Sequence, residues 1–229
     1  MPSKSPRKSA EDIALGGRLS DTAYSKVLEA LFEGRIPSGS FVSQAELVAL
    51  TGAPLSPLRD ALRTLESEGI VVIHPRTGIQ FVEPGFELTR ATFQFRSIIE
   101  TGAAAVFAET ASDDQIKHIL EQHQATINGI EANGLDAATL AHLEVLEDLL
   151  HGSIVASLNN PLIDSSYRRV RNYLRLIRLD RRLTTPLVLR SMREHMAIIE
   201  ACQARDPVKA VAALQAHFSA ALQRTLGLY

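Results

Sequence analysis

Residues 51–69 read TGAPLSPLRDALRTLESEG, and this stretch decides how the first third of the chain is interpreted. Apolar residues recur at the i, i+3, i+4, i+7 spacing of a helix that buries one face: Leu58, Ala61, Leu62 and Leu65. Arg59 and Arg63 are four residues apart and share another face of the same helix. Such a helix can enter the major groove of DNA, where arginine pairs with guanine or clamps a phosphate. An ordinary solvated surface helix can have the same pattern.

The flanking residues predict a winged helix-turn-helix around this stretch. Upstream, residues 24–32 have the pattern of a first amphipathic helix, GRIPSG at 34–39 makes a turn, and SQAE at 43–46 is a capping box that opens a second helix. Downstream, the β-branched runs 70–73 and 79–82 are joined by HPRTG, which is typical of a hairpin. Helices followed by a two-stranded wing form this DNA-binding unit.

The order of GRIPSG, SQAELVALTGAPLSPLRDALRTLESEGIV and the Gly78 wing resembles the DNA-binding domain of GntR-type bacterial transcription regulators, over residues 20–83. Pro54 and Leu55 depart from the family pattern, and Leu55 replaces an arginine that typically contacts DNA there. Because such a contact is worth about 1–3 kcal/mol of base discrimination, we expect a different operator sequence. The resemblance implies double-stranded operator DNA as a partner. The candidate DNA-binding residues are Ser43, Gln44, Ser56, Arg59, Arg63, Arg76, Thr77 and Gly78.

Charge and composition set further limits. Residues 1–83 carry nine Lys and Arg against ten Asp and Glu, so the usual basic footprint of a DNA-binding domain is absent. No apolar run reaches the roughly 18 residues of a membrane span, and the single Cys202 cannot form an internal disulfide, so we expect a cytoplasmic protein with no membrane partner. Residues 1–19 are polar, and we expect a flexible tail there.

A domain boundary is expected at Glu83-Pro84-Gly85, where the second wing strand meets two structure breakers. The sequence thus predicts a mainly α protein, with a winged helix-turn-helix at 20–84 and an all-α bundle at 85–229. The bundle is expected to have six helices, at about 87–110, 113–132, 136–158, 161–183, 186–204 and 207–226. Facing helices of such a bundle can hold a ligand or a metal.

Histidines carry the chemistry of this second part. Glu147 and His151 are four residues apart on one helix, and His195 and His217 lie among apolar residues on two later helices. If these side chains converged, they would suit a divalent transition metal such as Zn²⁺. Spacing alone leaves a second interpretation open, since a histidine on an apolar face is more often a hydrogen-bonded core residue.

Residues 90–222 resemble the FCD ligand-binding domain of the FadR subgroup of GntR regulators, and the six helices are more similar to its VanR-type branch. The matching stretches are RSIIE at 96–100, residues 147–161, Glu194-His195 and His217. The resemblance implies that Glu147, His151, His195 and His217 bind a metal that holds a small carboxylate effector. Glu147 stands where aspartate is usual, and Leu150 where phenylalanine is usual.

Arginines are the candidate partners of the effector carboxylate, because a guanidinium offers a bidentate fork. Arg96 is the first candidate, although it can instead pair with Glu100 one turn later. Arg175 belongs to an arginine stripe, with Arg168, Arg171, Arg178 and Arg182, that can equally be a solvated face. Asn160 completes the candidate effector set.

These patterns together predict a dimeric, metabolite-responsive transcription regulator, a repressor rather than an activator, and not an enzyme. Two alternatives stay open at this point. One is a metalloenzyme in which Glu147 serves as general base on a metal-bound water. The other is an all-α interaction module with a degenerate winged domain, which the loss of arginine at Leu55 favours.

Overall fold

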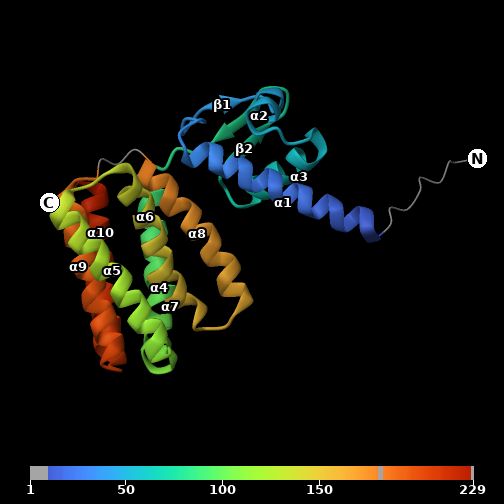
Figure 1. Ribbon diagram of the computed structural model, residues 1–229. Coiled ribbons are helices and arrows are strands. Elements are labelled where there is room, and N and C mark those ends of the chain that lie inside the picture. Colours follow the sequence, from blue (N-terminus) through green and yellow to red (C-terminus); the bar gives the residue numbers. More distant parts are fainter. Residues whose placement is uncertain (1–9, 180–182, 228–229) are drawn as a thin grey trace, which may run out of the picture. The chain divides into compact units, whose positions relative to one another are not determined.

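The computed structural model describes residues 10–179 and 183–227, with side chains from Gly17 onward. These residues divide into two compact units: residues 10–85 with Arg175–Leu179, and residues 86–174 with 183–227. No helix among the described residues is long and apolar enough to cross a bilayer. The winged helix-turn-helix and the helical second part that the sequence predicts are both present (Figure 1).

The first unit is built around α3 (Leu55–Ser67), which buries the four residues of the predicted apolar stripe. It packs against α1 (Ala10–Phe32) and α2 (Gln44–Thr51). The predicted capping box is present at α2, where the Ser43 hydroxyl accepts from the Glu46 N–H and the Glu46 carboxylate accepts from the Ser43 N–H. This reciprocal pair satisfies two donors that a helix start leaves free, and so fixes where α2 begins.

Two predictions about this unit need correction. The first helix begins at Ala10, so residues 10–19 are helical rather than part of a flexible tail, and residues 1–9 lie outside the described chain. The wing contains a third strand that the sequence pattern does not predict, β1 (Phe41–Val42). It pairs antiparallel with β3 (Gly78–Phe81), which also pairs with β2 (Val71–His74), giving the order β1-β3-β2. A two-residue strand has no periodicity to detect, and only its pairing defines it.

The second unit is a bundle whose helix boundaries lie close to the predicted ones. Its long helices run side by side in Figure 1, where α10 packs against α4 and α9, and α5 packs against α9. Side chains of Ser112, Asp136 and Asp206 accept backbone N–H groups at the starts of three of them. The bounds are α4 Phe86–Thr110, α5 Asp113–Asn133, α6 Ala137–Glu147, α7 Ser153–Ala156, α8 Pro161–Leu179, α9 Thr185–Gln203 and α10 Pro207–Leu226.

The expected single helix over 136–158 is interrupted. Between α6 and α7 the backbone widens into a π-helical turn, η1 (Asp148–Gly152), which carries His151. A Cβ at Gly152 would lie 2.7 Å from Asp148 Oδ1, and Asp148 pairs with Arg171 of α8 at 2.8 Å. The glycine therefore leaves the room that this ion pair needs. Single π-helical turns inside α-helices often occur at functional sites.

Candidate functional site

Three histidines from three different segments meet inside the bundle. His151 of η1, His195 of α9 and His217 of α10 are each at most 2 % exposed. One ring nitrogen from each lies within 4.8 Å of the other two. The His195 ring is 5.0 Å from the ring of His151 and 4.7 Å from that of His217, measured between centroids. The bundle thus gathers, in its buried interior, the three imidazoles that the sequence singled out.

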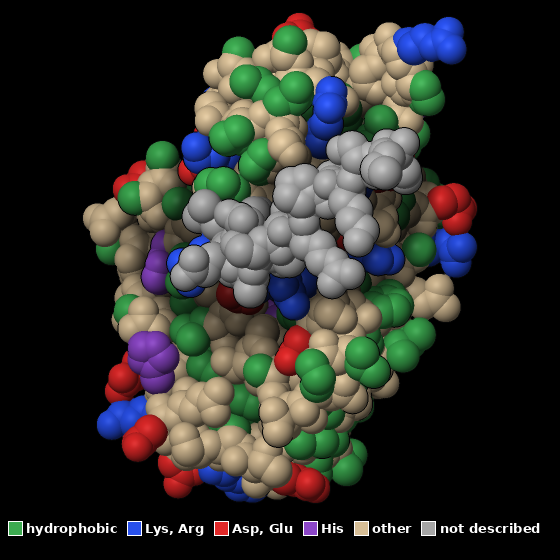
Figure 2. Space-filling model, turned by 90° about the vertical axis from the view of Figure 1, so that its right-hand side faces the viewer, with side chains coloured by type: hydrophobic (Ala, Val, Ile, Leu, Met, Phe, Trp, Pro, Cys, Tyr) green, Lys and Arg blue, Asp and Glu red, His purple; other side chains and the backbone are tan. Residues whose placement is uncertain are grey.

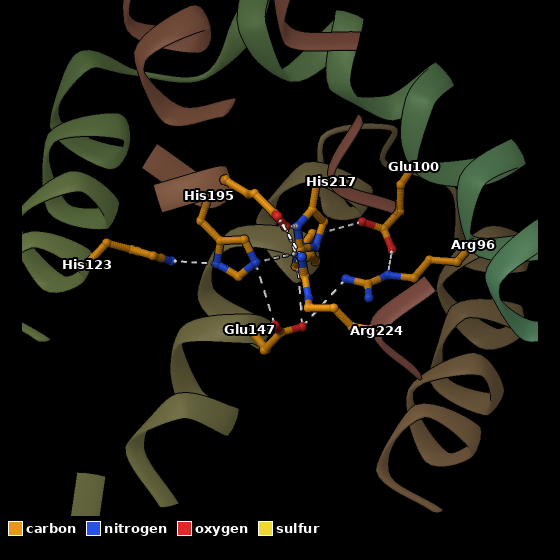
Figure 3. A network of polar contacts seen from close by, with 9 residues as sticks. Arg96, Glu100, His123, Glu147, His195, His217 and Arg224 are labelled. Atoms are coloured by element: carbon orange, nitrogen blue, oxygen red, sulfur yellow. Dashed lines mark hydrogen bonds and ion pairs between the residues drawn. The ribbon is translucent and has the colours of Figure 1, made fainter. Parts of the chain in front are cut away.

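Glu147, the fourth candidate ligand, lies beside two of these rings. Its Oε1 is 3.5 Å from His195 Nε2, and its Oε2 is 4.0 Å from His151 Nε2. The side chain retains 16 % exposure, unlike the histidines. Its carboxylate oxygen also lies 3.6 Å from Arg96 Nη2. The Glu147 carboxyl group therefore lies at the edge of the histidine cluster, as Figure 3 shows.

Arg96 is buried in the same network, with 1 % exposure. Its Nε donates to Glu100 Oε1 at 2.5 Å, so the pairing one turn along the helix is formed. Burial raises the pKa of Glu100 to about 7, even though Arg96 acts in the opposite direction. Among the described residues, however, Arg96 Nη1 has no hydrogen-bond partner. A buried guanidinium with an unsatisfied N–H can still take an anionic ligand.

The Nδ1 atom of each clustered histidine is held by a further side chain. His151 Nδ1 lies 2.6 Å from Glu100 Oε2, and His217 Nδ1 lies 2.9 Å from Glu194 Oε2. His195 Nδ1 lies 3.3 Å from His123 Nε2. These partners fix the orientation of all three rings and leave their Nε2 atoms for the interior of the cluster.

Glu194 is itself anchored by Arg224 of α10, whose two Nη groups donate to its two oxygens at 2.6 and 2.7 Å. Burial alone would raise the pKa of Glu194, but the hydrogen bonds from His217 and Arg224 outweigh it and hold the pKa at about 2. Glu194 is thus ionised at neutral pH and accepts a hydrogen bond from His217 Nδ1. In the neutral His217 imidazole, Nε2 then carries the lone pair.

This arrangement fits a divalent cation. His217 Nε2 is buried and has no hydrogen-bond partner among the described residues. The Nε2 atoms of His151 and His195 lie 3.4 Å apart. Two nitrogens bound tetrahedrally to zinc, each at about 2.0–2.1 Å, are separated by about 3.3–3.4 Å. Three nitrogens and one carboxylate are a donor set that borderline metals such as Zn²⁺ accept.

The other two candidate effector residues are not part of this cluster. The Asn160 side chain accepts backbone N–H groups of Leu162 and Ile163, at 3.0 and 3.4 Å, and so caps the start of α8. Arg175 lies in α8 within the segment that is grouped with the first unit. Of the arginine stripe, Arg171 pairs with Asp148, and Arg182 lies outside the described residues.

The sequence pattern does not single out the residues that support the histidines. His123, Glu194 and Arg224 were not candidates, and Glu100 was considered only as a partner of Arg96. A signal for His123 does exist, because it continues the buried stripe of Ile116, Ile119 and Ile127 on α5. No comparable pattern marks the carboxylates of Glu100 and Glu194, because only the packing of separate helices places them beside the histidines.

A second candidate surface lies on the first unit, at the starts of α2 and α3. Arg59 Nε donates to Gln44 Oε1 at 2.9 Å and so connects the two helices. This bond uses one of the five N–H donors of Arg59. Arg63 Nη1 is 3.6 Å from Asp60 Oδ1, with both side chains more than half exposed, which makes the pair weak. Ser56 is exposed in the first turn of α3.

The tip of the wing presents the remaining candidates. Arg76 and Thr77 are exposed, and Arg76 adopts a positive φ of 69° in the turn between β2 and β3. Gly78 has φ 129°, and a Cβ there would lie 3.0 Å from the Val42 carbonyl oxygen. Only glycine therefore lets β1 pair closely with the start of β3. Ser43, as the cap of α2, follows directly after β1.

Surface charge matches the balanced composition. On the face in Figure 2, Lys and Arg side chains lie interspersed with Asp and Glu, and no long field of one sign is present among the residues drawn in colour. On this face, contact with a polyanion would therefore depend on individual arginines rather than on a broad basic surface.

Each of the two parts of the chain matches the model of a known protein family. The model of the FCD domain matches residues 91–220, and that of the bacterial regulatory proteins of the gntR family matches residues 19–81. The chain is 24% identical over 201 residues to YdhC of Bacillus subtilis (strain 168), an uncharacterized HTH-type transcriptional regulator, covering 86% of each chain.

Two solved structures share the fold. One is McbR/YncC of E. coli, with a TM-score of 0.76 and 15% identity, covering 92% of this chain and 98% of that one. The other is a GntR-type transcriptional regulator from Rhodococcus sp. RHA1, with a TM-score of 0.73 and 18% identity, covering 93% and 99%. Both similarities extend over the winged unit and the bundle together.

Proposed function

Because the chain belongs to the gntR family of bacterial regulatory proteins and carries an FCD domain, a combination of regulators rather than enzymes, we propose that it represses transcription in response to a small carboxylate metabolite. It binds operator DNA as a homodimer through the winged unit. A divalent metal in the bundle, Zn²⁺ or a similar ion, holds the effector. The observation that carries the sensing half is the cluster of three buried imidazoles, in which His217 Nε2 has no partner among the residues that the structure describes.

The DNA-binding half rests on α3 and the wing. Arg59, which Gln44 orients, contacts bases or phosphates, and Arg63 and Arg76 add backbone contacts. Two copies of the unit read half-sites about one helical turn apart on a pseudo-palindromic operator. Leu55, which is 44% exposed in the first turn of α3, leaves one usual arginine contact unmade.

The sensing half rests on the donor set. His151, His195 and His217 hold the metal through Nε2, and Glu147 is the fourth protein ligand or yields its position to the effector. The ion supplies a Lewis-acid site for a carboxylate oxygen. Arg96 provides a second positive group, and its buried Nη1 has no hydrogen-bond partner within the described part of the chain. A small carboxylic acid would thus contact both a metal ion and a guanidinium inside the bundle.

Regulation requires that the effector favours one arrangement of the dimer over another, because a ligand that binds both equally shifts nothing. The test is a gel-shift titration with DNA from the promoter of the protein's own gene. It compares the metal-free protein, the zinc-loaded protein, and the zinc-loaded protein with acetate, succinate or citrate. We expect zinc plus one of these acids to change the operator affinity at least fivefold.

Three variants separate the two halves of the proposal. Arg59→Ala should weaken operator binding, whereas Arg90→Ala, which removes an exposed arginine of α4, should not. His217→Ala should abolish zinc binding and the response to the acid while DNA binding remains. Unchanged DNA affinity in Arg59→Ala would refute the DNA-binding role, and an acid response that persists in His217→Ala would refute the metal-dependent sensing.

A further inference from the structure

His123 of α5 lies just outside the three clustered histidines and is fully buried, with 0 % exposure. Its Nδ1 is 2.8 Å from the carbonyl oxygen of Ile119, one turn earlier on the same helix. A carbonyl oxygen can only accept, so His123 Nδ1 must carry a hydrogen. The backbone of α5 therefore fixes the tautomer of a neutral His123, with the lone pair on Nε2.

That lone pair faces His195. His123 Nε2 and His195 Nδ1 are 3.3 Å apart, and their rings meet edge to face at 5.4 Å between centroids (Figure 3). Because His123 Nε2 accepts, His195 Nδ1 must donate, and the hydrogen of a neutral His195 sits on Nδ1. The Nε2 atom of His195 then holds a lone pair, directed to the same side as His151 Nε2, 3.4 Å away, and Glu147 Oε1, 3.5 Å away.

Burial disfavours the charged forms of both imidazoles. It lowers the pKa of His123, and it lowers the pKa of His195 well below its ordinary value of 6.5. The neighbouring imidazoles of His217, His151 and His123 add to the effect on His195, while the carboxylate of Glu147 opposes it.

We propose that His123 is a positioning residue, which relays the hydrogen-bond direction of the α5 backbone to His195 and holds His195 in the tautomer that offers Nε2 to a cation. This inference rests on the proposed metal site but concerns a residue that never touches the ion. It explains why a fourth histidine is buried beside the cluster. The chain Ile119 to His123 to His195 is built from neutral groups, whereas His151 and His217 are oriented by the carboxylates of Glu100 and Glu194.

The two kinds of partner have different consequences for the ion. A carboxylate behind a histidine adds negative charge to the site and makes the ligand more basic, whereas a neutral imidazole only orients it. With His123 in this position, the site keeps one fewer negative charge than three carboxylate-backed histidines would bring. We therefore expect its loss to act on the tautomer and geometry of His195 rather than on the net charge of the site.

The test uses His123→Leu and His123→Gln in the full-length chain. Leucine removes the acceptor at similar volume, while the glutamine carboxamide oxygen can replace His123 Nε2 as acceptor. His118→Leu is the matched control, because His118 is an exposed histidine on the same helix. Zinc affinity is measured by competition with a chromophoric chelator. We expect a 10- to 100-fold loss in His123→Leu, partial recovery in His123→Gln and no change in His118→Leu.

A second measurement works without metal. Long-range ¹H–¹⁵N correlation spectra of the metal-free protein report which ring nitrogen of His195 carries the hydrogen. We expect Nδ1–H in the wild type and in His123→Gln, and a shift of population towards Nε2–H in His123→Leu. A wild-type His195 protonated on Nε2, or a zinc affinity in His123→Leu within twofold of the wild type, would overturn the proposal. If the wild type binds no zinc at all, the proposed metal function fails, while the spectra still decide the role of His123.

Discussion

The buried pair of Arg96 and Glu100 allows a quantitative test of how the bundle is held together. Arg96 is 1 % and Glu100 is 0 % exposed, and their side chains meet at 2.5 Å within α4. Arg96→Met keeps much of the side-chain volume but leaves the Glu100 carboxylate without its guanidinium. Removing one partner of a buried ion pair destabilises a protein by about 3–5 kcal/mol, because the other charge stays buried.

The same helix provides a matched control. Arg90 pairs with Glu87 at 2.9 Å, but these side chains are 53% and 76% exposed. Arg90→Met should therefore change the free energy of unfolding by less than about 1 kcal/mol. In urea denaturation of the metal-free protein, followed by circular dichroism at 222 nm, Arg96→Met should lower the midpoint by at least about 1 M, given a slope of about 1–3 kcal/mol per molar.

The effect should also depend on pH. Burial raises the pKa of Glu100 to about 7 from an ordinary value of 4.5, so the folded protein holds a proton that the unfolded chain releases. The contribution of this group to stability therefore falls as the pH rises from 4.5 to 7. Without Arg96 the pKa of Glu100 rises further, so the pH range over which its ionisation destabilises the folded protein extends above 7. The destabilisation by Arg96→Met should therefore be larger at pH 8 than at pH 5.

A double variant checks the cause. In Arg96→Met/Glu100→Gln the buried charge is gone, and the amide oxygen can still accept from His151 Nδ1, so this variant should be more stable at pH 8 than Arg96→Met alone. Two results would contradict this explanation. One is an equal loss in the free energy of unfolding in Arg96→Met and Arg90→Met, and the other is a double variant that is no more stable than Arg96→Met at pH 8. Either would show that Arg96 does not offset the cost of burying the Glu100 charge.

Three further predictions address other parts of the chain. Cys202 is fully buried and burial raises the pKa of its thiol to about 11, so a disulfide reagent at pH 8 should label it at a much lower rate in the native protein than in guanidinium chloride; equal rates would contradict this burial. Gly78→Ala should destabilise the winged unit by about 1–3 kcal/mol in thermal unfolding, because of its φ of 129° and the nearby Val42 carbonyl, while Gly102→Ala, with open space around it, should not destabilise the protein. Leu55→Arg should raise DNA affinity and steepen the dependence of log K on log salt by about one, whereas Leu162→Arg on α8 should leave both unchanged.

Much of the fold could be predicted because it depends on local patterns. The stripe of α3 and the capping box at Ser43 are properties of a few consecutive residues, and both are found as expected. The helix boundaries of the bundle follow from caps such as Ser112 and Asp206, whose side chains bond to backbone only three residues away. The sequence pattern does not predict the start of α1 at Ala10, because the adjacent Gly16 and Gly17 disfavour a helix there, although Ala10, Ile13 and Ala14 have helical spacing.

The sequence by itself determined the two-part organisation, the helices and the three histidines worth considering, because periodicity and capping act within a few residues of one another. Only the tertiary structure decided what those histidines form. His123, His151 and His195 are separated by 28 and 44 residues along the chain, yet His195 lies 3.3 Å from His123 and 3.4 Å from His151, measured between ring nitrogens. The direction of each hydrogen bond, and with it the nitrogen left for a cation, follows from partners that other helices bring, and no local pattern carries that information.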